Sequence, residues 1–140
     1  MRTDTDLQRF LDAQQTDYAA ALEEISGGMK RSHWMWYVFP QISGLGQSEI
    51  ARYYGIRNCA EAAAYLAHPV LGRRLAEISR ALLQHQGRSA HSIFGSPDDL
   101  KLRSSMTLFA SLPGADPVFQ EVLNRFYEGR PDERTLQLLH

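Results

Sequence analysis

The 140-residue sequence contains a single cysteine, Cys59, so no disulfide can form within the chain. It has no run of the roughly 18 apolar residues that a membrane-spanning helix needs. Its first six residues carry no apolar stretch of the kind found in signal peptides. We therefore expect a cytoplasmic protein that does not engage a membrane, and a lone cysteine suits such a reducing compartment. Cys59 stands next to Ala60, and we expect this cysteine to be a small buried residue.

The sequence has no large excess of either charge: it contains 15 basic and 16 acidic residues, and the formal net charge is -1. A dedicated nucleic-acid-binding domain usually shows a basic surplus, so no nucleic-acid partner is expected. Histidine and cysteine pairs at metal-ligand spacing are also missing from the sequence, and we expect neither a metal nor a cofactor. The composition, 44% hydrophobic and 22% charged, is typical of a globular protein, and residues 1–140 are expected to form one domain.

Helical periodicity is clearest at the N-terminus, where apolar residues recur on one face over residues 7–25. Asp4 or Asp6 is expected to cap this helix, and two glycines end it at 27–28. The aromatic residues 33–39 alone would fit a strand or a helix, but no convincing partner strand exists elsewhere. We therefore predict a short buried helix there, with Ser32 as its N-cap.

The rest of the sequence is divided by capping residues, prolines and glycines into further helical segments. Ser48, Asn58 and Ser96 are predicted N-caps. Helices are predicted at about residues 48–54, 59–67, 69–86, 96–112, 116–128 and 132–139, with a brief turn or helical piece at 89–94. The predicted fold is all-α: one compact domain of about seven short-to-medium helices, unlike a regular four-helix bundle because the helices are too many and too uneven.

Both tryptophans lie in the most aromatic stretch, residues 30–41. Such a cluster either pins the core or forms the floor of a ligand pocket, because Trp and Tyr bury large areas and carry a polar group that needs a partner. Trp34 and Trp36 are two residues apart and point about 200° from each other on a helix. One is therefore expected deep in the core and the other nearer a cleft.

A second polar face is predicted on the helix that begins near Ser96. Lys101, Ser104 and Ser105 share one side of it, apart from the apolar stripe that ends at Phe109. We expect this face and the aromatic stretch to meet and form the main concave surface, where helix starts favour an anion. The alternative is that Asp98 and Asp99 already satisfy the helix start. The candidate ligand-binding residues are Lys30, His33, Trp34, Trp36, Gln41, Asp98, Lys101, Ser104 and Ser105; no catalytic residue is assigned.

Two weaker patterns have simpler structural explanations. The glycine-rich segment 44–49 runs into a helix start and could hold a phosphate, but a tight turn with Ser48 as a cap explains it equally well. Lys101 with Ser104 or Ser105 could form a base and a nucleophile. No oxyanion hole is evident, and small serines also allow close helix packing.

The block from His33 to Gln41, together with residues 54–56, 68–72, 94–101 and 104–109, resembles a family of small, mostly bacterial proteins. That family is catalogued as a domain of unknown function and is sometimes mislabelled calpastatin. The resemblance covers nearly the whole chain and implies an all-helical single domain with no established activity. A fainter resemblance connects the chain to NADAR-type proteins, which process N-glycosidic bonds in ADP-ribose or riboflavin-pathway compounds. It is limited to a helical domain with tryptophans and a late methionine-containing helix.

Three functions fit these observations. The first is binding of a small anionic, possibly nucleotide-like ligand in a cleft beside residues 33–41. The second is a non-enzymatic protein-interaction module in which the aromatic residues are purely structural. The third is an N-glycosidase-like hydrolase acting on an ADP-ribose or nucleotide derivative, with Asp98 or Asp99 as the base. The sequence favours ligand binding and leaves the oligomeric state open.

Overall fold

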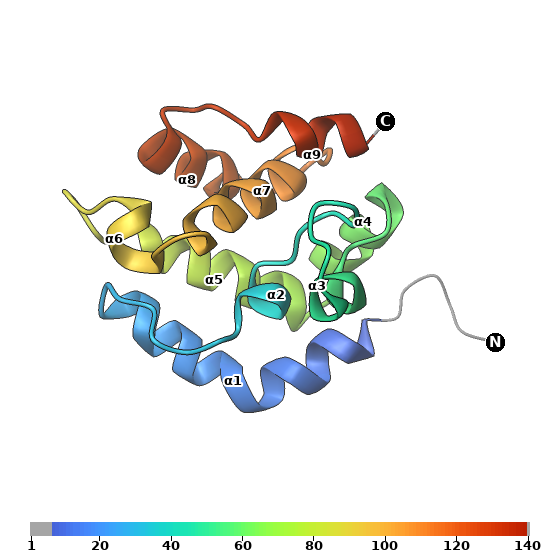
Figure 1. The fold of residues 1–140 in the computed structure, drawn as a ribbon, viewed down its shortest axis with the longest axis horizontal. Coiled ribbons are helices and arrows are strands. Elements are labelled where there is room, and N and C mark those ends of the chain that lie inside the picture. The colour runs from blue at the N-terminus through green and yellow to red at the C-terminus, as the bar shows by residue number, and fades with distance from the viewer. Residues whose placement is uncertain (1–6, 140) are drawn as a thin grey trace.

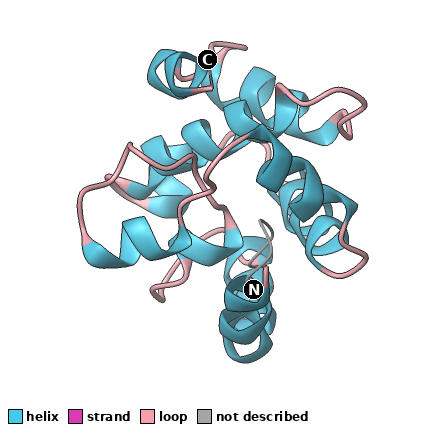
Figure 2. Cartoon of the chain, turned by 90° about the vertical axis from the view of Figure 1, so that its right-hand side faces the viewer, coloured by secondary structure: helices cyan, strands magenta, loops and turns pink. Residues whose placement is uncertain are grey.

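Nine helices and no strand make up the regular structure of residues 7–139, the part of the chain that this computed structural model describes (Figures 1 and 2). In chain order they are α1 (Gln8–Ser26), α2 (Met35–Val38), α3 (Glu49–Tyr54), α4 (Cys59–Ala67), α5 (Leu71–Leu83), α6 (Ala90–Phe94), α7 (Asp98–Ala110), α8 (Val118–Tyr127) and α9 (Glu133–Leu138). The predicted all-α single domain is confirmed. Every segment predicted to be helical forms a helix, and the piece predicted as a turn or helix at 89–94 forms α6, so the count among the described residues is nine and not about seven.

The long helices are layered across the molecule, with α1 at one edge, α8 and α9 at the other, and α5 and α7 between them (Figure 1). α5 packs against both α1 and α8, and α7 packs against α8. The central position of α7 buries it on nearly every side, so that Leu102, Met106 and Phe109 face the core as predicted. α7 therefore links the C-terminal layer to the aromatic stretch that precedes it in the chain.

The predicted helix caps are confirmed at two positions. The side chains of Ser48 and Asn58 accept hydrogen bonds from backbone N–H groups in the first turns of α3 and α4. Ser32 and Ser96 do not act as caps, because the residues that precede α2 and α7 are Trp34 and Pro97. The Ser32 hydroxyl donates to a glutamate instead. The proposed caps of α1, Asp4 and Asp6, lie outside the described residues.

The two tryptophans differ in burial, as predicted. Trp34 is 0% exposed and packs against both Phe39 and Phe94, with ring centroids 6.2 and 6.4 Å away. Trp36 is only partly buried. Trp34 is therefore part of the core, whereas Trp36 lies near the surface.

The expectation that Cys59 is buried is wrong. Asn58 occupies the N-cap of α4, so Cys59 becomes the first residue of that helix and is exposed. The face that α4 buries begins two residues later, with Glu61, Ala62 and Tyr65. The position of the cap thus decides which residues face the core, and it places the thiol outside.

None of the helices formed by residues 7–139 is long and apolar enough to cross a lipid bilayer.

Candidate functional site

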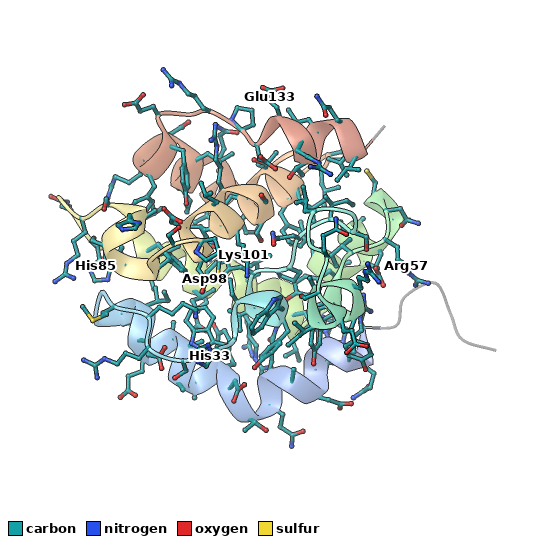
Figure 3. All side chains as sticks on the ribbon, in the orientation of Figure 1. His33, Arg57, His85, Asp98, Lys101 and Glu133 are labelled. Atoms are coloured by element: carbon teal, nitrogen blue, oxygen red, sulfur yellow. The ribbon has the colours of Figure 1, made fainter. Side chains whose placement is uncertain are left out.

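Both lysines of the sequence converge on one carboxylate, although the other basic residues, all arginines, are spread along the chain. Lys30 Nζ lies 2.9 Å from Asp98 Oδ2, and Lys101 Nζ lies 3.4 Å from Asp98 Oδ1. Lys101 and Asp98 are neighbours on the first turn of α7 (Figure 3). Lys30 comes from the loop between α1 and α2, 68 positions earlier than Asp98 in the chain.

Each of these two lysines also lies over a tryptophan ring. Lys30 Nζ is 4.9 Å from the centroid of Trp34, and Lys101 Nζ is 5.1 Å from that of Trp36. Both distances are within the range of a cation–π contact. The two lysines, both tryptophans of the chain and Asp98 thus form one cluster, which we call the lysine–tryptophan cluster. The predicted meeting of residues 30–41 with the start of α7 is confirmed by these contacts.

The two lysines of this cluster differ in accessibility. The Lys30 side chain is 7% exposed, and its ammonium group also donates to the carbonyl oxygen of Ser32. The Lys101 side chain is 28% exposed. With one carboxylate between two ammonium groups the cluster carries a net positive charge, and Lys101 is the member that a ligand from solvent can reach.

A cavity of about 190 Å³ adjoins the cluster on the Lys101 side. The loop that follows α2 supplies one wall, and the start of α7 supplies the other. The loop is held in place by a hydrogen bond from the backbone N–H of Ile56 to the carbonyl oxygen of Gln41, 2.8 Å long. The residues that line the cavity are Gln41, Leu45, Gly46, Pro97, Leu100, Lys101 and Ser104.

The structure brings some of the predicted site residues together and separates others. Gln41, Lys101 and Ser104 line the cavity. Ser104 Oγ lies 3.1 Å from Asp132 Oδ2, so the serine is already engaged by the segment before α9. His33 is exposed and lines none of the cavities described here, and its carbonyl oxygen accepts a hydrogen bond from the Tyr37 hydroxyl.

Ser105 is not on the accessible surface, contrary to the expectation that core packing leaves this face of α7 free. Its side chain is 0% exposed, and its hydroxyl has no hydrogen-bond partner among the described residues. The reason is the central position of α7, which buries residues 104–109 on all sides. The expectation that this region forms the main concave surface is also wrong, because a cavity of about 350 Å³ lies elsewhere, between α4, α5 and α8.

Glu24 holds the loop that carries Lys30, and sequence reasoning missed it. Glu24 Oε1 accepts hydrogen bonds from the backbone N–H groups of Arg31 and Ser32 and from Trp34 Nε1, at 2.8 to 3.0 Å. Glu24 Oε2 accepts from the Ser32 hydroxyl at 2.6 Å. One carboxylate on α1 thus fixes the start of the aromatic stretch. No short-range pattern marks it, since Trp34 is 10 residues away.

These hydrogen bonds change the acidity of Glu24. Burial alone raises its pKa, but donation from the Ser32 hydroxyl, the Arg31 N–H and Trp34 Nε1 outweighs it, and the pKa falls from 4.5 to about 2. The carboxylate is therefore more acidic in the folded chain than in the unfolded chain. Its stabilising effect is complete above about pH 4.5 and is lost as the pH falls through about 2.

We expect Glu24→Gln to lower the melting temperature at neutral pH, because glutamine cannot accept four hydrogen bonds as an anion. The difference from the parent protein should shrink as the pH falls below about 4.5, where the Glu24 carboxylate begins to be protonated in the unfolded chain while it stays ionised in the folded one. The measurement is thermal unfolding of both proteins between pH 7 and pH 3. Glu128→Gln, in an exposed ion pair, is the control and should cause little change at any pH. A Glu24→Gln effect that stays constant down to pH 3 contradicts this interpretation.

No group of three or more His, Cys, Asp or Glu side chains within residues 7–139 is arranged to hold a metal ion.

Comparison with known proteins shows which family this chain matches. The model of the family described as "Protein of unknown function (DUF1810)" matches residues 4–139. The crystal structure of the conserved hypothetical protein Rv1873 from Mycobacterium tuberculosis is similar in fold, with a TM-score of 0.95. That protein is 51% identical in sequence, and the match covers 98% of this chain and 98% of the other. The comparison with curated proteins gave no match.

Proposed function

We propose that this chain, which belongs to the DUF1810 family of proteins of unknown function, binds a small anionic ligand in the cavity beside Lys101. Family membership confirms the resemblance seen in the sequence and brings no activity with it. The proposal therefore rests on the lysine–tryptophan cluster. The observation that carries it is that two ammonium groups share the single carboxylate of Asp98 at the edge of a cavity.

Charge favours an anion at this position. Asp98 neutralises one of the two lysines, and Lys101, whose side chain is 28% exposed, is the charged side chain that lines the cavity. The attraction between an ammonium group and an anion about 4 Å away rises from about 1 kcal/mol in water to about 4 kcal/mol near a protein surface. An anion that binds there completes the charge balance of the cluster. The Gln41 side-chain amide, which also lines the cavity, can add a neutral hydrogen bond.

The volume of the cavity limits the size of the ligand. At about 190 Å³ it is smaller than the roughly 300–1,000 Å³ of ordinary small-molecule sites. Leu45, Pro97 and Leu100 give it apolar walls. A phosphorylated pentose fits this combination better than a complete nucleotide, whose base would lie outside the cavity.

Stacking of a base on Trp36 is not part of the proposal. Lys101 Nζ already lies over the Trp36 ring. The cavity that Trp36 does line has a volume of only about 20 Å³, which is room for about one water molecule. The tryptophans therefore serve to position the lysines.

Asp98 is better suited to the role of counter-ion than to that of a general base. Each of its two oxygens lies within 3.4 Å of a lysine ammonium group. A general base must offer an oxygen to the proton that it removes. This arrangement favours binding over the hydrolase hypothesis.

We expect ribose 5-phosphate to bind the protein saturably in a calorimetric titration, and Lys101→Gln to weaken that binding by roughly tenfold or more, because a hydrogen bond to a charged group contributes about 1.5–3 kcal/mol. Unphosphorylated ribose should bind much more weakly. The control is Arg130→Gln, which removes a positive charge from an exposed ion pair and should leave the affinity unchanged. Equal affinity in the parent and Lys101→Gln contradicts the proposal, and so does the absence of binding at millimolar ribose 5-phosphate and ADP-ribose.

A further inference from the structure

The cavity of about 350 Å³ between α4, α5 and α8 has no part in the proposed function. Its volume lies within the roughly 300–1,000 Å³ of ordinary ligand sites. It shares no lining residue with the cavity beside Lys101. We propose that it is a second binding site, which takes a small organic carboxylate with a compact apolar body.

Part of the lining of this cavity is apolar. Leu66 at the end of α4, Ala76 in the middle of α5 and Phe119 in the first turn of α8 all line it. Phe119 is only 1% exposed, and its ring packs on Phe109 with the centroids 5.9 Å apart. Phe119 therefore lies behind the cavity wall, and Leu66 and Ala76 supply most of the apolar surface that a short aliphatic or aromatic group can reach.

Two arginines flank the apolar part on α5. Arg73, Ala76 and Arg80 stand at positions i, i+3 and i+7, which lie on one helical face. Seven residues of helix separate the two arginines by about 10 Å along the axis. The residue that lines the cavity between them on this face is the small Ala76, so α5 leaves open space between two long cationic side chains.

The two arginines differ in their partners. The Arg80 guanidinium pairs with Asp116 Oδ2, and Asp116 Oδ1 accepts a hydrogen bond from the Val118 N–H at the start of α8. This chain of contacts anchors Arg80. Arg73 is exposed and makes no ion pair with the residues that the structure describes. Its guanidinium is therefore available to a ligand.

The charged side chains that line this cavity carry a net positive charge. Two guanidinium groups and one carboxylate line it, which leaves a single positive charge to be balanced. The planar fork of an arginine matches a carboxylate with two parallel hydrogen bonds. A carboxylate bound to Arg73, with its apolar body against Leu66 and Ala76, satisfies both the charge and the apolar part of the lining.

The test uses 3-phenylpropionate as the probe and its neutral amide, 3-phenylpropionamide, as the matched ligand control. We expect saturable binding of the acid at millimolar concentration or below, measured by ligand-observed NMR on the full chain. Arg73→Gln should weaken it by roughly tenfold, the loss expected for about 1.4 kcal/mol. Ala76→Leu, which fills the space between the arginines, should abolish it.

Lys101→Gln separates this proposal from the first site, since it should leave the binding of 3-phenylpropionate unchanged. Arg73 is exposed, so Arg73→Gln is expected to fold, and a melting temperature close to that of the parent verifies this. The proposal is overturned by equal binding of the acid and the amide, by an affinity that Arg73→Gln leaves intact, or by the absence of saturable binding of the acid.

Discussion

Trp34→Ala is expected to lower the free energy of unfolding by about 3–5 kcal/mol, the cost of removing a buried aromatic side chain and leaving a cavity. Trp34 is fully buried and packs against Phe39 and Phe94, and its Nε1–H donates to Glu24. The substitution therefore removes both core packing and the partner of a carboxylate that organises the loop before α2. For a domain of this size the melting temperature should fall by roughly 10 °C or more.

Two variants separate these contributions. Trp34→Phe keeps an aromatic ring but loses the hydrogen bond to Glu24, and it should be less damaging than Trp34→Ala. Trp36→Ala removes a half-buried ring and its contact with Lys101, at an expected cost of about 1 kcal/mol. Thermal and denaturant unfolding measure all three. If Trp34→Ala melts within a degree or so of the parent, Trp34 does not pin the core.

Glu61→Ala is the second large effect, with an expected loss of about 3–5 kcal/mol, because it removes a buried carboxylate that pairs with the buried guanidinium of Arg9 and also with Arg57. Glu61 is 1% exposed, and Arg9 lies 3.3 Å from it. Arg9 also donates to the carbonyl oxygens of Tyr53 and Gly55. The pair thus connects the start of α1 to the segment that joins α3 to α4.

The pair itself need not be stabilising relative to an apolar pair of similar size. Replacing both members, as Arg9→Met with Glu61→Leu, should recover much of the stability that Glu61→Ala loses, since no charge then remains buried. The control is Glu128→Ala, in an exposed ion pair, which should cost less than about 1 kcal/mol. Denaturant unfolding compares the three proteins. A double variant as unstable as Glu61→Ala would show that the loss does not come from breaking this charge pair.

Local signals account for the parts of the fold that the sequence predicts well. Ser48 and Asn58 start helices because their side chains accept hydrogen bonds within three residues. The buried stripe of α5 repeats every three to four residues, so its helix could be recognised without its neighbours. The same local reasoning fails at Ser32, whose hydroxyl finds Glu24 eight positions earlier in the chain.

Long-range contacts account for what the sequence does not reveal. Arg9 and Glu61 are 52 positions apart, and each looks like an ordinary exposed charge until the fold buries it. Ser105 and Thr107 are polar, so the pattern of α7 shows little contrast between its faces although the helix is central. The cavity between Arg73 and Phe119 depends on the packing of α5 against α8, which periodicity alone does not reveal.

The candidate site was predictable in part. Aromatic enrichment in residues 30–41 and the separate face with Lys101 led to the correct expectation that the two segments meet. The sequence did not reveal that Asp98 is the point of contact for both lysines. Asp98 looks like a helix-capping residue, and its second role depends on a loop 68 positions earlier that Glu24 holds in place.

The most direct test of the central claim is a crystal structure of this protein soaked with ribose 5-phosphate. We expect ligand density in the cavity lined by Gln41, Pro97 and Lys101, with a phosphate oxygen within hydrogen-bond distance of Lys101 Nζ and Asp98 still paired with Lys30. Soaking crystals of Lys101→Gln should leave the cavity without ligand. A ligand seated elsewhere, or one whose phosphate makes no contact with Lys101, would contradict the account.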